Sequence, residues 1–252
     1  MTALRNIGSI ARTAYLDLAA LVRQMWPVLL AIAALYVAAV MAYFSVSLLV
    51  GTGLGRVVMR MLVFIGCAAV TAPCFVALHR FVAFREVRWL PPADAYRHAR
   101  VYIGWIGLSV AMWFAPLIAA IALDGAGLTA LGGLLGLGGL LAVWSLMVRL
   151  TTLWPMAALE PGRASLSRAL EQSRGHFWMI FAATNGPASP AFFALILIGR
   201  AAAQHAIGAL PFWLLAMSAM LSLQIVLLAV GTRLYQRFSA ASALAQGRQP
   251  SV

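Results

Sequence analysis

Long apolar runs dominate the pattern along this chain, and six of them are long enough to cross a bilayer, which takes about 20 residues in a helix. The runs cover residues 27–50, 57–78, 101–123, 128–148, 177–199 and 207–230. Short polar segments separate them, and nothing divides the chain into a soluble part and a membrane part. The pattern predicts an all-α fold, a six-helix transmembrane bundle that forms a single membrane domain over residues 1–252.

The segments outside these runs predict short interfacial helices on the cytoplasmic side. Residues 1–25 combine an apolar stripe with Arg5, Arg12 and Arg23 on another face, which is typical of a helix lying in the membrane interface. The stripe consists of Leu4, Ile7, Ala11, Leu18, Val22 and Met25. Residues 163–176 repeat the pattern more weakly, and a solvated connecting helix is the alternative there. Residues 231–252 are predicted to be a cytoplasmic tail.

Composition supports a membrane environment. Hydrophobic residues make up 63% of the chain and charged residues 10%, whereas soluble domains are about half apolar and a quarter charged. So few charged groups cannot cover a water-facing surface, so lipid must be the solvent for much of the chain.

The arginines predict the orientation of the bundle. The net charge is +12, and all 18 basic residues are arginines. Three precede the first run, five lie between the second and third, four between the fourth and fifth, and three follow the sixth, fifteen in all. Arg56, Arg60 and Arg200 lie on the opposite side. Because cytoplasmic loops carry the excess of arginine, we expect both termini in the cytoplasm, as in a protein of the bacterial inner membrane.

The same arginines suggest a partner. A basic excess can indicate nucleic acid or an anionic membrane surface, and the chain has no contiguous basic block, so we expect no nucleic acid. Fifteen arginines against five acids give the cytoplasmic side a formal charge of +10, and each basic residue near an anionic surface adds about 1 kcal/mol of attraction. We therefore expect binding to anionic membrane lipid; the alternative is that these arginines only set topology. The candidate headgroup ligands are Arg85, Arg88, Arg163, Arg168 and Arg174.

The fifth run contains the segment Asn185–Gly–Pro–Ala–Ser–Pro190. Each proline removes a helix donor and disfavours helical geometry in the residue before it, which predicts a broken helix. Carbonyls freed there must be covered by protein or line a wet cavity. Asn185, Gly186, Pro187 and Ser189 are accordingly the candidate ligand-binding residues, and a transporter or channel for a small uncharged or anionic solute is the alternative function. A packing kink capped by Thr184, Asn185 and Ser189 is the structural alternative.

The fourth run carries a Gly132–x–x–x–Gly136 pair. Small residues at this spacing let membrane helices approach closely. The pair predicts packing within the bundle, and the alternative is a dimer seam, so a homo-oligomer or another membrane protein is a possible partner.

Sequence motifs for catalysis, metal or cofactor binding are missing, which argues against an enzyme and predicts no metal and no cofactor. The six acids also lie outside the centres of the apolar runs, which argues against a proton relay. The remaining enzymatic alternative is that cytoplasmic histidines and acids converge into one site. Those residues are His98, His176, Asp94, Glu160 and Glu171.

One stretch resembles a known family. Arg149 comes directly after the fourth run and is followed by Pro155 and Glu160. Ser173–Arg–Gly175 then precedes Trp178 at the start of the fifth run. This order resembles the bacterial membrane-domain family attached to some glycerophosphodiester phosphodiesterases, over about 30 of the 252 residues. The resemblance implies a membrane bundle in a bacterium, with no hydrolase activity of its own.

Overall fold

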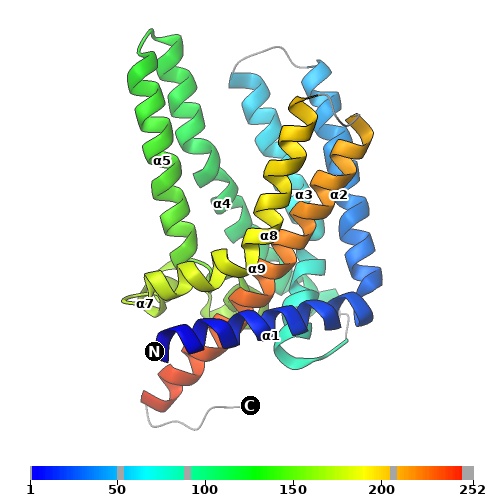
Figure 1. Ribbon diagram of the computed structural model, residues 1–252, viewed down its shortest axis with the longest axis vertical. Coiled ribbons are helices and arrows are strands. Elements are labelled where there is room, and N and C mark those ends of the chain that lie inside the picture. The colour runs from blue at the N-terminus through cyan, green and yellow to red at the C-terminus, as the bar shows by residue number, and fades with distance from the viewer. Residues whose placement is uncertain (1, 50–53, 88–91, 205–208, 246–252) are drawn as a thin grey trace.

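The computed structural model describes residues 2–49, 54–87, 92–204 and 209–245. These residues form an all-α fold with long apolar helices (Figure 1). The helices are α1 (Thr2–Gln24), α2 (Trp26–Leu49), α3 (Leu54–Phe84), α4 (Pro92–Gly125), α5 (Thr129–Arg149), α6 (Leu153–Leu159), α7 (Leu166–Gln172), α8 (Phe177–Ala203) and α9 (Ala209–Ala245), with a 3-10 turn at Pro161–Arg163.

Five of the described helices, α3, α4, α5, α8 and α9, are long and apolar enough to cross a membrane. A sixth span is counted if α1 and α2, which meet at a bend of 89°, are taken together. The bend separates two kinds of helix: α2 runs along the bundle, whereas α1 lies across its end (Figure 1). The chain is therefore a multi-pass membrane protein, and the predicted helical bundle is confirmed.

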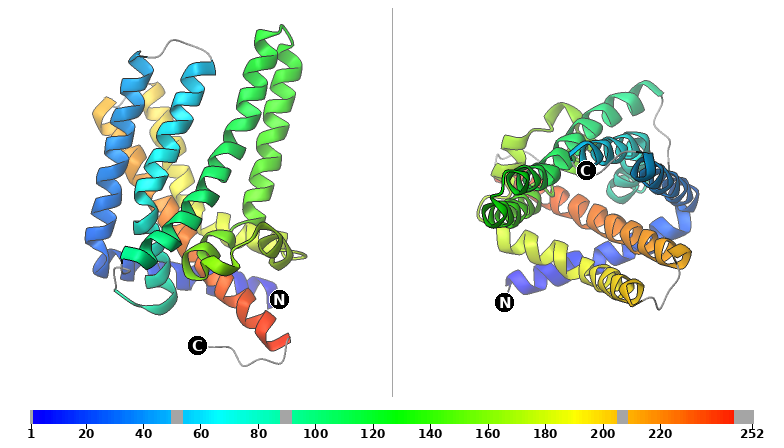
Figure 2. Two further views of the ribbon diagram at one scale, coloured as in Figure 1. Left: turned by 180° about the vertical axis from the view of Figure 1, so that it is seen from behind. Right: turned by 90° about the horizontal axis from the view of Figure 1, so that it is seen from above.

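The helices pair as hairpins. α4 packs against α5 and α3, α8 against α9, and α2 against α3. The α4/α5 hairpin stands to one side of the other long helices in each view (Figure 2). In the most apolar stretch of α4 no residue is buried inside the bundle, whereas 44% of the corresponding stretch of α9 is buried. Lipid is the natural solvent for such an exposed apolar hairpin.

The predicted glycine pair packs within this hairpin. A Cβ added at Gly132 would lie 2.9 Å from the Ala120 carbonyl oxygen, and one at Gly136 would lie 3.1 Å from the Ala120 Cβ. The missing side chains on α5 therefore allow the α4 backbone to approach closely. The pair therefore packs inside the bundle, as predicted.

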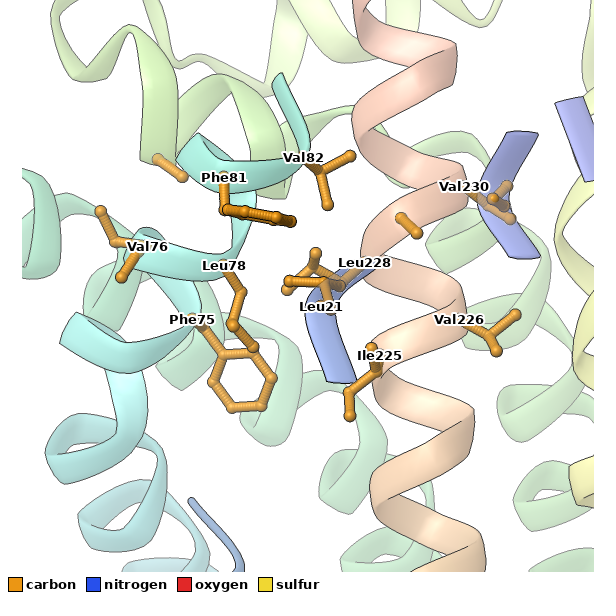
Figure 3. Packing of buried hydrophobic residues seen from close by; sticks show 14 of the residues in the cluster. Leu21, Phe75, Val76, Leu78, Phe81, Val82, Ile225, Val226, Leu228 and Val230 are labelled. Carbon is orange, nitrogen blue, oxygen red and sulfur yellow. The ribbon is translucent and has the colours of Figure 1, made fainter. Parts of the chain in front are cut away.

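The core lies at the end of the bundle that carries α1. Leu21 of α1 inserts between Phe75, Leu78 and Phe81 of α3 on one side and Ile225 and Leu228 of α9 on the other (Figure 3). The short helix α6 is buried at the same end against α3, α4 and α9. These contacts position the polar groups described below.

At this end the structure adds two features that were not predicted from the sequence. The buried face of α1 comprises Ile10, Ala14, Asp17 and Leu21, together with Met25 just beyond its end, while Val22 of the predicted stripe is 53% exposed. The buried face is therefore a second face of α1, turned toward the bundle, and it includes the polar residue Asp17; an exposed Val22 agrees with a stripe that faces the membrane interface. Residues 231–245 were expected in a tail but continue α9, and Leu234, Tyr235 and Phe238 are buried there because α1 and α6 pack on them.

Candidate functional site

Polar side chains gather where α1, α3, α4, α6 and α9 meet. This is the end of the bundle to which α1, the 150–176 segment and the last turns of α9 all belong (Figure 1). The site contains three neighbouring groups, centred on Asp17, His79 and Glu160.

Asp17 is the centre of the first group, and its side chain is fully buried. Arg233 of α9 binds both carboxylate oxygens, with Nε 2.7 Å from Oδ2 and Nη2 2.8 Å from Oδ1. Arg85 also donates from Nη2 to Oδ1. Charge-assisted bonds of this forked kind are among the strongest hydrogen bonds in proteins. Together the three side chains carry a formal charge of +1 and tie α1 to α3 and α9.

Local structure positions both arginines. Arg85 is the first residue after α3 and has φ 59°, in the left-handed region that non-glycine residues rarely adopt. Its guanidinium carbon lies 5.5 Å from the centre of the Phe81 ring. Arg233 donates from Nη1 to Gln236 Oε1 at 3.0 Å, and Gln236 Nε2 donates to the Ala83 carbonyl oxygen at 3.1 Å. These contacts fix both guanidinium groups around the carboxylate.

His79 forms the second group and is also buried. Thr232 donates its hydroxyl hydrogen to the Leu228 carbonyl oxygen, so it can only accept from His79 Nδ1, 2.8 Å away. His79 Nε2 then accepts from the Tyr102 hydroxyl at 3.3 Å. The hydrogen bond to Thr232 thus assigns a proton to Nδ1, and the cost of burying a charged ring favours the neutral form, with Nε2 as the acceptor. A fully bonded neutral histidine of this kind joins α3, α4 and α9 without a charge.

Glu160 forms the third group, immediately after α6. It accepts from the Tyr235 hydroxyl of α9 at 2.8 Å and pairs with Arg163 at 2.9 Å. One residue before the end of α6, the Ala158 carbonyl oxygen accepts from His98 Nδ1 at 2.7 Å. These bonds hold α6 against α4 and α9.

Four of the predicted headgroup arginines, Arg85, Arg163, Arg168 and Arg174, lie at this end of the bundle, but they differ in their surroundings. Arg85 belongs to the Asp17 group, although 49% of its side chain remains exposed. Arg163 is paired with Glu160. Arg168 and Arg174 are exposed, and no carboxylate of the described residues lies within ion-pair distance of either. Arg88 falls outside the described residues.

The predicted break in the fifth span is wrong, because α8 is one continuous helix from Phe177 to Ala203. Pro187 and Pro190 lie inside it, and the helix changes direction along its length, first running beside α1 and then beside α9 (Figures 1 and 2). Prolines bend a helix without breaking it where the freed groups find partners.

Those partners are found around the bend, as the kink alternative predicted. Ser189 donates to the Gly186 carbonyl oxygen at 2.7 Å, which replaces the donor that Pro190 lacks. Asn185 Nδ2 donates to Phe181 at 2.9 Å, and Thr184 Oγ1 to Ile180 at 2.8 Å. The Tyr15 hydroxyl reaches from α1 to the Pro187 carbonyl oxygen at 2.8 Å. Asn185 and Ser189 thus donate to carbonyl oxygens of their own helix. The transport alternative was motivated by a broken helix, and α8 is not broken.

The described histidines bond to groups other than carboxylates. His79 and His98 have the partners given above, and His176 stacks on Phe238 with ring centres 5.4 Å apart. Glu160 is engaged by a tyrosine and an arginine. Within the described residues, no group of three histidine, cysteine or acidic side chains is arranged to hold a metal ion.

Sequence reasoning missed the importance of Asp17. The signal was present: Asp17 lies one helical turn from both Ala14 and Leu21, on a face that is otherwise apolar. A single acid on such a face needs a cationic partner if the face is buried.

Comparisons of this chain with protein-family models, with curated proteins and with solved structures give no match. The functional conclusion therefore rests on the site itself.

Proposed function

We propose that this chain is a non-enzymatic protein of the bacterial inner membrane that binds anionic phospholipid through its arginine-rich end, which faces the cytoplasm. The inner-membrane location follows from the arginine asymmetry and from the resemblance described above. The ligand follows from the arginines themselves, because guanidinium groups bind phosphate in a forked geometry.

The observation that carries the proposal is the surplus of positive charge at one end of the bundle. Arg168 and Arg174 extend from α7 and the turn after it, and no carboxylate of the described residues lies within ion-pair distance of either, so that with Glu171 between them they leave this segment a net positive charge. Arg85 is half exposed and belongs to the Asp17 group, whose three side chains together carry a formal charge of +1. Exposed Trp178, at the start of α8, is suited to the headgroup level. Cations and an interfacial aromatic side chain at one level favour an anionic headgroup.

Lipid retention tests this function. The full chain is reconstituted in vesicles with equal amounts of phosphatidylglycerol and phosphatidylcholine and extracted in mild detergent, and the retained lipid is measured by mass spectrometry. We expect phosphatidylglycerol to be enriched several-fold, with the enrichment falling as salt screens the arginines. Equal retention of the two lipids at low salt would mean that the arginines only set topology.

A further inference from the structure

The carboxylate of Asp17 is a buried anion held by arginine side chains. Two guanidinium groups from two different helices converge on it, and Arg233 grips both oxygens in the forked geometry. A phosphate group offers the same arrangement of acceptor oxygens to arginine as a carboxylate does. Asp17 is therefore positioned as an internal ligand of Arg85 and Arg233.

Asp17 belongs to α1, whose direction differs from that of the other long helices. α1 lies across the end of the bundle and joins α2 through a bend of 89°. Its outer face exposes Leu16 and Arg12, a combination suited to the membrane interface. In the proposed orientation α1 lies in the membrane interface, which is also the level of the phospholipid phosphates, and its inner face carries the Asp17 carboxylate to the arginine pair.

The arginine pair is incompletely neutralised. One carboxylate faces two guanidinium groups, and 49% of the Arg85 side chain is exposed compared with 23% of that of Arg233. The positive φ of Arg85 and its position over the Phe81 ring hold its guanidinium at the edge of the bundle. An incoming phosphate therefore meets Arg85 first.

We propose that Arg85 and Arg233 form a phosphate-binding pair for an anionic phospholipid headgroup, and that Asp17 competes with the headgroup for it. This inference rests on the proposed function and assigns a specific site to it. Lipid phosphate binds at the exposed edge of Arg85, and the Asp17 carboxylate lowers the affinity of the pair. The shared chemistry is an arginine-bound phosphate, which a lipid or free phosphate ion can supply.

Competition and a purely structural role predict opposite results when Asp17 loses its charge. A competing carboxylate lowers lipid affinity, so Asp17→Asn should bind phosphatidylglycerol about fivefold more tightly than the unmodified chain. A carboxylate that merely anchors α1 predicts unchanged or weaker binding. Glu171→Gln is the matched control, because it removes the same charge from an exposed acid at the same end.

The experiment titrates the full chain in neutral detergent with short-chain phosphatidylglycerol and measures bound lipid by native mass spectrometry. The tighter binding expected for Asp17→Asn should exceed that of Glu171→Gln and should disappear in the double variant Asp17→Asn/Arg85→Gln. Equal affinities for Asp17→Asn and Glu171→Gln would overturn the proposal. So would displacement of the lipid by millimolar inorganic phosphate, which would make free phosphate the ligand.

A second variant keeps the proposal falsifiable if Asp17→Asn does not fold. Arg85→Gln leaves the forked Asp17–Arg233 pair in place, so α1 remains anchored. It should bind phosphatidylglycerol about fivefold more weakly, whereas Arg237→Gln, an exposed arginine one turn after Arg233, should change binding less. Equal losses in the two variants would overturn the site.

These experiments distinguish failure of the Asp17 competition from failure of the proposed lipid binding. If the unmodified chain retains anionic lipid but Asp17→Asn gains nothing over its control, the function stands and the competition is refuted. If the unmodified chain shows no selectivity while Asp17→Asn binds phosphatidylglycerol, the site stands and the function of the unmodified chain is refuted.

Discussion

Buried hydroxyl groups at the arginine-rich end show how individual polar residues are stabilised. Thr232 is fully buried, but it accepts from His79 and donates to Leu228. Thr152, at the start of α6, is also fully buried, and its hydroxyl oxygen has no hydrogen-bond partner among the described atoms. A buried polar group without a partner costs free energy, whereas a bonded one does not. The two threonines should therefore respond oppositely to loss of the hydroxyl.

Thr232→Val and Thr152→Val form a matched pair of substitutions. Thr232→Val leaves the His79 N–H without an acceptor and should lower the free energy of unfolding by about 1–3 kcal/mol. Thr152→Val removes an unpaired oxygen and should be neutral or slightly stabilising. Thermal unfolding of both variants in detergent measures the difference. Equal loss in the two variants would contradict the bonding of His79 described here.

At the level of whole helices, close approach and bending have different origins. The α4/α5 contact requires glycine at positions 132 and 136, because a Cβ at Gly132 or Gly136 would come too close to atoms of α4. The bend in α8 depends instead on added partners, with Ser189 and Tyr15 covering carbonyl oxygens near its two prolines. The glycine pair and the capping of the bend by residues of α8 itself were both visible in the sequence, whereas the contact from Tyr15 of α1 was not.

Neighbouring glycines in α5 test the close approach. Gly132→Ala places a Cβ 2.9 Å from the Ala120 carbonyl oxygen, so the helices must separate, and we expect a loss of about 1–3 kcal/mol. A Cβ at Gly133 has no neighbour within 4 Å, so Gly133→Ala should be neutral or stabilise by up to about 1 kcal/mol. Thermal unfolding and light scattering separate stability from assembly. A change of oligomeric state in Gly132→Ala, with unchanged stability, would instead indicate a dimer seam.

For the molecule as a whole, the arginine-rich segments come together although they are far apart in sequence. α1, the 150–176 segment and the last turns of α9 share one end of the bundle (Figure 1). The tip of the α4/α5 hairpin, around Asp124, lies at the other. Positive charge is thus concentrated at one end of the bundle, and the positive-inside rule predicts that this end faces the cytoplasm.

Cysteine accessibility tests this orientation. In a chain with Cys67→Ser and Cys74→Ala, single cysteines are introduced by Ser167→Cys on α7 and Ala126→Cys at the tip of the α4/α5 hairpin, both exposed positions. A membrane-impermeant thiol reagent added to spheroplasts should label the Ala126→Cys protein, and the Ser167→Cys protein only after permeabilisation. The reverse pattern would place the arginine-rich end outside.

Hydrophobic periodicity predicted the long helices well, because in lipid every backbone group must bond within its own helix. The prediction of the fifth run started at residue 177, where α8 begins, and α5 differs from its predicted run by one residue at each end. The burial of Asp17 could have been read from its apolar helix face, but its partners could not, because the two arginines lie 68 and 216 residues away in sequence. The inner face of α1 and the helical extension of α9 depend on the same tertiary contacts.

The most direct test of lipid binding at the arginine-rich end compares its arginines with one at the opposite end. Arg168→Gln/Arg174→Gln removes two exposed cations from the proposed lipid-binding end, and Arg200→Gln removes an exposed cation from the other. Phosphatidylglycerol retained after extraction from mixed vesicles is measured for each variant and for the unmodified chain. We predict that retention falls several-fold in the double variant and stays unchanged in Arg200→Gln. Unchanged retention in the double variant, or an equal loss in Arg200→Gln, would contradict lipid binding by this end of the bundle.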